Sequence, residues 1–227
     1  MYKGDDIADI PDERKSELFQ REKELIFSEI MIQDRLEAAI AKAQALRDSS
    51  DLGSRFQKRT FDTWDACRFP STYRRLKDYA DSNRHEDGLG FVLCGNPGTG
   101  KTHLAAAVAN ALIEKGVQVR FANFVDVLAE IKENFGTQRS TKIEEELANV
   151  PLLILDDIGN LNEWRNETLY RIINRRYEKE LPIIITTNAN PAELERLLWE
   201  KTFSRIGEMC EFVEMNGEDY RLEGRTA

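Results

Sequence analysis

The chain has 227 residues, 41% of them hydrophobic, which is enough for one α/β domain of ordinary size with an appendage and too few for two full domains. Its formal net charge of −9 makes the field of the whole chain repel phosphate backbones, which argues against a constitutive DNA-coating protein. Cys67, Cys94 and Cys210 are far apart and accompanied by only two histidines, which excludes a recognisable zinc site or disulfide framework and suits a reducing cytoplasm.

Residues 1 to 50 are expected to form a helical arm. Residues 12 to 47 are highly charged and nearly free of helix breakers, and apolar residues recur every seven positions, at Leu18, Leu25, Ile32, Ala39 and Leu46. This spacing predicts a long amphipathic helix or a pair of helices. The apolar stripe either packs back on the body of the protein, pairs with itself or docks a partner.

Turn residues and Gly53 follow this arm, so we place a domain boundary near residue 50, with a second domain at 51–227. The first fourteen residues lack a long apolar core, and no stretch approaches about 18 consecutive apolar residues. We therefore expect a soluble cytoplasmic protein that makes no membrane contact.

Beyond Phe61 the pattern alternates between strand and helix. Helices are predicted over 101–115 and 164–180, and another begins at Asn190, where Asn, Pro and Glu occupy the positions of a helix start. The apolar, β-rich runs cover 90–94, 118–123, 151–155, 182–187 and about 211–214. Nearly continuous apolar strands separated by helices indicate an α/β fold with a parallel sheet covered on both faces.

The sequence GNPGTGKT at 95–102 lies between the first of these strands and a helix. It meets the pattern G-x-x-x-x-G-K-T in the context that a phosphate-binding loop requires. The glycines let backbone N–H groups turn toward phosphate oxygens, and the helix N-terminus adds its positive end. Lys101 is expected to reach the β- and γ-phosphates, and the Thr102 hydroxyl to ligate Mg²⁺.

Two later strands end in polar side chains at the same edge of the predicted sheet. The run Leu152-Leu-Ile-Leu ends at Asp156 and Asp157. We take Asp156 as the carboxylate on the Mg²⁺ side and Asp157 as the group that polarises the attacking water. Asn188 follows the next strand and is placed to hydrogen-bond the γ-phosphate or that water. Together with the loop, these residues predict hydrolysis of a nucleoside triphosphate.

With these motifs in order, residues 55 to 222 resemble the AAA+ ATPases, in particular the bacterial and phage helicase loaders of the DnaC type, which share an ATPase core with IstB-like proteins. The resemblance rests on six segments: FDTW at 61–64, GNPGTGKTHLAAAVAN at 95–110, LLILDDIG at 152–159, ITTN at 185–188, FSRI at 203–206 and DYRL at 219–222. It implies a P-loop NTPase of three layers, with a five-stranded parallel sheet and no substantial helical lid.

The resemblance also implies cofactors, partners and roles. ATP and Mg²⁺ are the cofactors, and the nucleotide-binding residues are Gly95, Asn96, Pro97, Gly98, Thr99, Gly100, Lys101, Thr102, His103 and Arg221. The arm at 1–50 binds a hexameric replicative helicase, and copies of the chain associate with ATP into a spiral that places the helicase on single-stranded DNA. Arg205 reaches the γ-phosphate of a neighbouring copy, and Arg221 is a second nucleotide sensor.

This chain departs from the family pattern in three places. Asp157 stands where many AAA+ ATPases have Glu, so its carboxylate lies about one methylene further back and turnover is expected to be slow. Residues 1–50 contain no Cys or His, which excludes the zinc-binding domain of some loaders. The segment 124–150, which contacts DNA in the family, carries a net negative charge here. Two other basic groups are interpreted as solvated helix faces: Arg74, Arg75 and Lys77, and Arg171, Arg175 and Arg176.

The leading hypothesis is an ATP-dependent helicase loader that hydrolyses ATP between neighbouring copies. An IstB-like transposition helper has the same ATPase core and delivers a transposase instead. A non-hydrolysing adaptor, gated by ATP binding alone, is consistent with Asp157 and the missing lid. A small-molecule P-loop kinase is disfavoured by Asn188 and Arg205 and by the lack of an arginine-rich lid.

Overall fold

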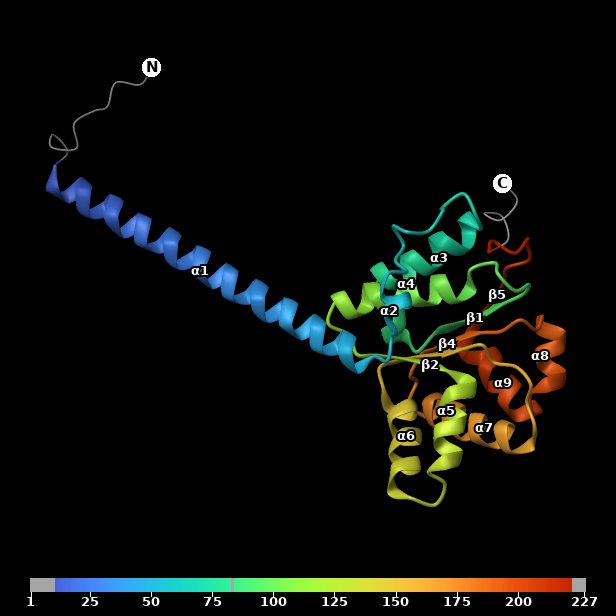
Figure 1. The fold of residues 1–227 in the computed structure, drawn as a ribbon. Coiled ribbons are helices and arrows are strands. Elements are labelled where there is room, and N and C mark those ends of the chain that lie inside the picture. Colours follow the sequence, from blue (N-terminus) through green and yellow to red (C-terminus); the bar gives the residue numbers. More distant parts are fainter. Residues whose placement is uncertain (1–10, 83, 222–227) are drawn as a thin grey trace. The chain divides into compact units, whose positions relative to one another are not determined.

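The computed structural model describes residues 11–82 and 84–221 (Figure 1). The chain divides into two compact units, Met1–Gln44 and Ala45–Ala227. Among the described residues no helix combines the length and apolarity needed to cross a membrane. The first ten residues of the arm, and Leu222 of the C-terminal motif, lie outside the described part of the chain.

The described part of the first unit is a single helix, α1 (Asp12–Ser49), rather than a pair of helices. Its last residues, from Ala45 on, belong to the second unit. At 100° per residue, Leu18 and Leu25 share one side of α1, whereas Phe27 and Met31 lie on the opposite side. The expectation of one amphipathic stripe is therefore wrong, because the apolar residues surround most of the helix.

The second unit is built on a five-stranded parallel sheet in the order β2-β3-β4-β1-β5. The strands are β1 (Gly90–Cys94), β2 (Val119–Asn123), β3 (Leu152–Asp156), β4 (Ile183–Thr186) and β5 (Cys210–Glu214). Each falls within one residue or so of a predicted apolar run. The α/β fold and the five-stranded sheet are thereby confirmed, and β1, β3 and β4 are almost wholly buried because helices cover both faces.

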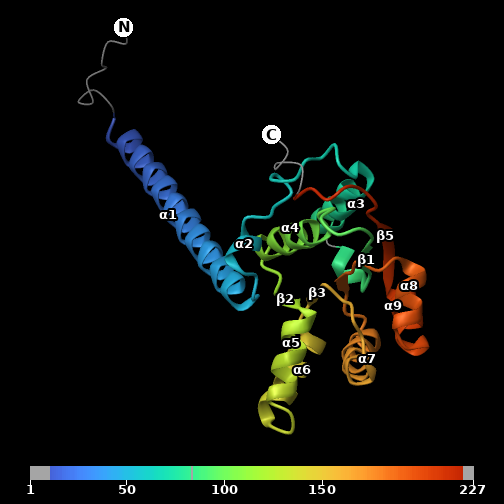
Figure 2. The same cartoon turned by 45° about the vertical axis from the view of Figure 1, so that its right-hand side comes forward.

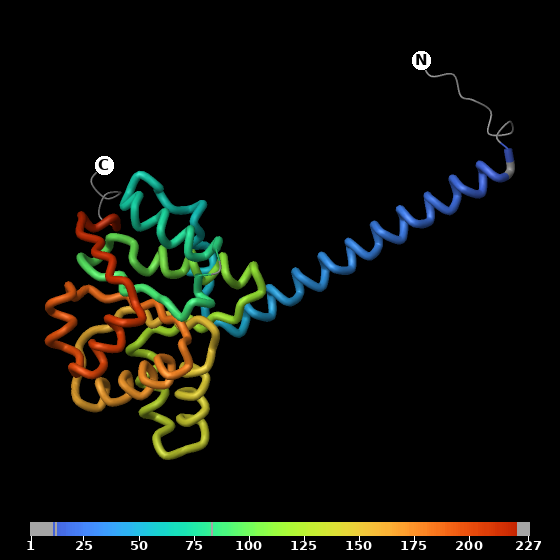
Figure 3. Tube along the Cα trace, turned by 180° about the vertical axis from the view of Figure 1, so that it is seen from behind, coloured from blue at the N-terminus to red at the C-terminus, as the bar shows by residue number. Residues whose placement is uncertain are grey.

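Helices cover the two faces unequally (Figure 2). One face packs against α3 (Pro70–Asp81) and α4 (Lys101–Glu114), and the short α2 (Ser54–Gln57) packs on α4. The other face packs against α5 (Phe124–Glu133), α6 (Gln138–Asn149), α7 (Glu163–Glu178) and α9 (Glu200–Met209). Helices α5 and α6 lie side by side, as Figure 3 shows from behind. The 3₁₀ helix η2 (Arg84–Asp87) precedes β1.

The predicted helix starting after Asn190 is confirmed as α8 (Pro191–Leu197). The Asn190 side chain accepts from the Glu193 backbone N–H at 2.9 Å, and the Glu193 carboxylate accepts from the Asn190 N–H at 2.9 Å. Pro191 occupies the first helical turn, where its missing N–H removes no helical hydrogen bond.

The interpretation of Arg176 as a solvated residue is wrong. Its side chain is fully buried, and its guanidinium donates to four backbone carbonyls, at Leu147 (2.9 Å), Val150 (2.8 Å), Pro151 (3.4 Å) and Pro182 (2.5 Å). Burial lowers its pKa to about 9. These acceptors lie where α6 ends and where β3 and β4 begin, so Arg176 joins α7 to the amino-terminal edge of the sheet.

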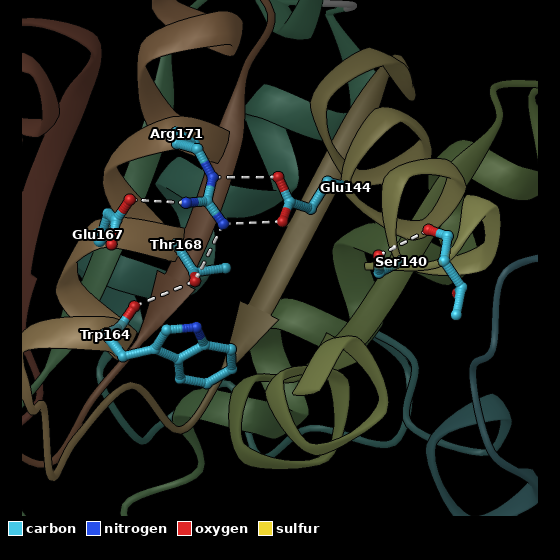
Figure 4. Close-up of polar contacts among 7 residues, drawn as sticks. Ser140, Glu144, Trp164, Glu167, Thr168 and Arg171 are labelled. Atoms are coloured by element: carbon cyan, nitrogen blue, oxygen red, sulfur yellow. Dashed lines mark hydrogen bonds and ion pairs between the residues drawn. The ribbon is translucent and has the colours of Figure 1, made fainter. Parts of the chain in front are cut away.

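Arg171 is also engaged, on the side of α7 that faces α6 (Figure 4). Its Nη2 and Nε donate to the two carboxylate oxygens of Glu144 at 2.8 and 3.1 Å, and its Nη1 donates to Glu167 at 3.0 Å. A bidentate pair of this kind fixes geometry as well as charge. Arg171 therefore joins α7 to α6, and of this basic group only Arg175 is an exposed side chain.

Candidate nucleotide-binding site

The loop between β1 and α4 adopts a conformation that requires glycine. Gly95, Gly98 and Gly100 have φ angles of 118°, 74° and 94°. A Cβ atom on Gly98 would lie 1.8 Å from a carboxylate oxygen of Asp219, and one on Gly100 would lie 2.3 Å from the Trp64 ring. The chain thus approaches the loop closely from two directions, and the loop leads directly into the N-terminus of α4.

Lys101 begins α4 and is buried inside the loop. Its Nζ donates to the carbonyls of Gly95 at 2.7 Å and Asn96 at 2.6 Å. Burial lowers the pKa of Lys101, and the charge of Asp157 partly opposes that shift. The ammonium group is thus held at the loop, where phosphate oxygens would compensate its lost hydration.

Asp156, the last residue of β3, is buried beside the start of α4. Burial raises the pKa of its carboxyl group, and hydrogen bonds from the hydroxyls of Thr186 and Thr102 lower it. The Thr186 hydroxyl donates to Asp156 Oδ1 at 2.7 Å. Asp156 and Thr102 therefore meet although they are 54 positions apart, as expected for two residues at the carboxyl edge of a parallel sheet.

Asp157 follows in the left-handed region, with φ of 61°, and its side chain is exposed. Its backbone N–H donates to the Thr186 hydroxyl at 2.9 Å, and its Oδ1 accepts from the Asn188 side chain at 3.2 Å. Thr186 therefore contacts both acids, with the buried carboxylate on one side and the backbone of Asp157 on the other. This geometry places Asp157 and Asn188 together.

These residues line a cavity of about 630 Å³ at the carboxyl edge of the sheet. Most of the expected site residues lie on its wall: Pro97, Gly98, Thr99, Gly100, Lys101, Thr102, His103, Asp156, Asp157, Asn188 and Arg221. Gly95 and Asn96 reach the site through the carbonyls that bind Lys101. The expected residues thus converge on one cavity, with the exception of Arg205.

Another part of the cavity wall comes from residues 55–65, for which the sequence pattern predicts no role in binding. This segment contributes Arg55, Phe56, Arg59, Thr63, Trp64 and Asp65. Trp64 packs edge-on against His103, and the His103 ring contacts the Thr60 carbonyl and the Thr63 hydroxyl, each at 3.2 Å. Burial lowers the pKa of His103. The FDTW motif at 61–64, which contains Trp64, is the sequence feature that could have indicated this part of the cavity wall.

The C-terminal segment returns to the phosphate-binding loop. The Tyr220 N–H donates to the Gly98 carbonyl at 3.1 Å, and the Asn96 side chain donates to the Gly217 carbonyl at 3.2 Å. The guanidinium of Arg68 lies over the Tyr220 ring, 3.3 Å from its centroid. These contacts bring Arg221 to the cavity wall, where its positive charge helps to lower the pKa of Lys101.

Arg205 lies on α9, outside the set of residues that line the cavity. Its Nη1 donates to the Lys201 carbonyl at 2.8 Å, and its guanidinium lies 5.3 Å from the centroid of Tyr170 and 5.5 Å from that of Tyr177. Among the described residues, Arg205 therefore does not contribute to the wall of the nucleotide cavity in its own chain.

A family model described as IstB-like ATP binding protein matches residues 21–227. The chain belongs to the IstB-like ATP-binding family. Its fold is that of the AAA+ P-loop proteins, and the resemblance noted from the sequence is confirmed.

The relatives of this chain include helicase loaders and an insertion sequence protein. The replicative helicase loader DnaC of Escherichia coli (strain K12) is 34% identical over 137 residues, 58% of this chain and 56% of DnaC. The replicative helicase loader DnaI of Bacillus subtilis is 30% identical over 161 residues, 69% of this chain and 50% of DnaI. A putative insertion sequence ATP-binding protein of Sinorhizobium fredii is 34% identical over 144 residues, 59% of this chain and 47% of that protein. The chain spans about half the length of the curated relatives it matches.

Solved structures agree on the fold. The crystal structure of the DnaC helicase loader matches with a TM-score of 0.67 and 29% identity, over 72% of this chain and 99% of that one. The replication initiator DnaA bound to AMPPCP and single-stranded DNA matches with a TM-score of 0.64 and 23% identity, over 74% of this chain and 52% of that one. The second likeness concerns the fold alone.

The residues that line the cavity of this IstB-like protein suit a nucleoside triphosphate. The positive φ angles of Gly95, Gly98 and Gly100 give the loop the conformation of a phosphate-binding loop, and Lys101 is the buried cation at the loop. No three His, Cys, Asp or Glu side chains cluster as a metal site anywhere in the described residues. A P-loop Mg²⁺ takes most of its ligands from phosphates and water, so Thr102 and Asp156 would be enough to hold the ion beside a bound nucleotide.

Proposed function

We propose that this protein is an ATP-dependent loader of a replicative DNA helicase that acts in the cytoplasm. It binds the hexameric helicase through its N-terminal helix and uses ATP binding and hydrolysis in an oligomer to place the helicase on single-stranded DNA. The convergence of Lys101, Asp156, Asp157 and Asn188 on one cavity carries the ATPase part of this proposal. The relatives named as helicase loaders support the choice of partner.

In the proposed reaction Lys101 neutralises charge on the β- and γ-phosphates, and Thr102 and Asp156 hold Mg²⁺, which supplies further charge neutralisation when bound. Asp157 accepts a proton from the attacking water, and Asn188 orients Asp157 or the water through the same side-chain contact that the structure contains. The Asp157 carboxylate is exposed, so it reaches a water without displacing core residues. Its short side chain makes turnover slow, which suits a timing switch better than a motor.

In this proposal Arg205 of one copy supplies a positive charge to the γ-phosphate that is bound by the neighbouring copy. A residue that lies outside its own cavity is suited to act on the next one. Copies related by one repeated head-to-tail contact form a closed ring or an open spiral, and the spiral is the form proposed here. Such an arginine contributes about 10³- to 10⁵-fold in rate in other P-loop enzymes. In the same proposal Arg221 senses the nucleotide within its own chain, because it lines the cavity near Lys101.

The N-terminal helix is the proposed docking element. Within its own unit α1 has no second described element against which to pack, and its apolar side chains occupy several sides. A helix of this kind suits burial among helices of a partner. Binding to single-stranded DNA is weak or dependent on the partner, since the chain carries a net charge of −9.

The test is size-exclusion chromatography with light scattering on the protein mixed with the host's replicative helicase, with and without ATP·Mg²⁺. The full chain is compared with a truncation that begins at Ala45 rather than at residue 51, because the compact unit starts there. The Phe121 N–H donates to the Ser50 carbonyl at 2.8 Å, so removing Ser50 would damage β2. A complex that needs residues 1–44 supports the proposal, and no complex in any nucleotide state contradicts it.

A transposition helper is the second candidate, favoured by the insertion sequence relative. It uses the same cavity and differs in the partner of the N-terminal helix. Co-purification with a transposase and not with a hexameric helicase would select it.

A further inference from the structure

Arg205 lies against two tyrosines of the neighbouring helix. Tyr170 and Tyr177 are seven residues apart on α7 and therefore share one face. The guanidinium carbon of Arg205 lies within 6 Å of both ring centroids, a range in which cation–π attraction operates. The guanidinium donates one hydrogen bond, from Nη1 to the Lys201 carbonyl of its own helix, and its buried Nε has no partner.

No carboxylate in the described ranges pairs with Arg205, although one is close. Glu208 follows Arg205 by three positions on α9, a spacing at which opposite charges on a helix attract each other. Instead the Tyr177 hydroxyl donates to Glu208 Oε2 at 2.7 Å. Arg171, on the side of α7 that faces α6, is an arginine whose charge is taken up by carboxylates, since it pairs with both Glu144 and Glu167.

We propose that Tyr177 is a positioning residue for Arg205. Its ring supports the guanidinium, and its hydroxyl holds Glu208 away from it, so that the charge of Arg205 stays available for the γ-phosphate of a neighbouring copy. This inference rests on the proposed role of Arg205 between copies. Tyr177 itself contacts neither the nucleotide nor the attacking water. It acts only in the copy that donates Arg205.

The experiment mixes two kinds of chain. The acceptor carries Arg205→Ala, so it binds ATP and donates no arginine. The donor carries Lys101→Ala, so its own site is silent and its Arg205 is intact. Hydrolysis then arises only where a donor arginine enters an acceptor site. The donor is tested further with Tyr177→Phe, with Tyr177→Phe plus Glu208→Gln, and with Tyr170→Phe, which removes a hydroxyl from the same face and keeps the ring.

Tyr177→Phe releases Glu208 to pair with Arg205 in cis, and we expect the rate stimulated by this donor to fall about 2- to 5-fold, the effect of one exposed ion pair. Adding Glu208→Gln to the donor restores the rate, because no carboxylate remains to compete. Tyr170→Phe retains the rate. The same Tyr177→Phe change placed in the acceptor has no effect, which a general loss of folding would not reproduce.

The outcomes separate the two claims. If the Lys101→Ala donor fails to stimulate hydrolysis, or stimulates it equally without its Arg205, the proposed role of Arg205 is wrong. If donation depends on Arg205 and the Tyr177→Phe donor is as active as its parent, the inference about Tyr177 is wrong. A loss that Glu208→Gln fails to restore also overturns it.

Discussion

Thr186 is the residue on which both acids of the site depend, so its replacement by Val tests the geometry of the site. The substitution keeps the shape and removes the hydroxyl. The buried Asp156 carboxylate then loses a donor at 2.7 Å, and the Asp157 N–H loses an acceptor at 2.9 Å. A hydrogen bond to a charged group contributes about 1.5–3 kcal/mol and a neutral one about 1 kcal/mol. We expect the free energy of unfolding to fall by about 2.5–4 kcal/mol at pH 8.

The pH dependence of this loss identifies its cause. The Thr186 hydrogen bond lowers the pKa of Asp156, so the folded variant has a higher Asp156 pKa than the folded wild type. The bond to the carboxylate therefore contributes stability above these pKa values and loses that contribution as the pH falls through them and Asp156 takes up a proton. The difference between wild type and Thr186→Val should shrink as the pH falls from 8 toward 4.

The matched control is Thr187→Val, one residue further along. The Thr187 hydroxyl donates to the Ile158 carbonyl at 2.7 Å and accepts from the Ala189 N–H at 3.1 Å, so it binds no ionisable group. Urea unfolding of the nucleotide-free variants across this pH range measures both effects. A Thr186→Val loss below about 1 kcal/mol at pH 8, or a loss that is as independent of pH as that of Thr187→Val, would refute the reasoning.

Three further changes have definite expected outcomes. Gly98→Ala should raise the Kd for ATP about tenfold, because an alanine rarely adopts a φ of 74° and its Cβ would displace the Asp219 carboxylate beside the loop. Gly136→Ala, at a similar φ of 77° with open space around it, should leave the Kd unchanged in a nucleotide titration. Arg176→Met should lower the free energy of unfolding by about 3–5 kcal/mol, because four buried carbonyls lose their donor; a loss under about 1 kcal/mol in urea would contradict its structural role. Asp157→Asn should lower ATP hydrolysis at least about 100-fold with an unchanged Kd for ATP, and helicase loading that survives this loss would favour the adaptor gated by ATP binding alone.

The sequence was sufficient for the sheet and for the residues at its carboxyl edge. Five apolar runs separated by helices predict parallel strands, and parallel strands bring Thr102, Asp156 and Asn188 to one edge whatever their separation along the chain. Local glycine and helix-start patterns have the same predictive power, because they describe backbone conformations that few residues adopt.

Side-chain contacts between elements that are distant in the sequence could not be predicted from it. Arg176 looks like any helical arginine until the carbonyls at the end of α6 and at the start of β4 are placed around it. Thr186 looks like an ordinary strand residue until Asp156 and Asp157 lie beside it. The tail is a partial exception, since the resemblance implied that Arg221 binds the nucleotide, whereas the hydrogen bond from the Tyr220 N–H to the Gly98 carbonyl could not be predicted.

The central claim is that ATP is hydrolysed between copies of this chain, and the most direct measurement is the rate of hydrolysis per chain as a function of protein concentration. We expect almost no turnover at high dilution and a rate per chain that rises steeply as copies associate, with Arg205→Ala abolishing the rise. Fast hydrolysis at high dilution, independent of concentration and of Arg205, would contradict the claim.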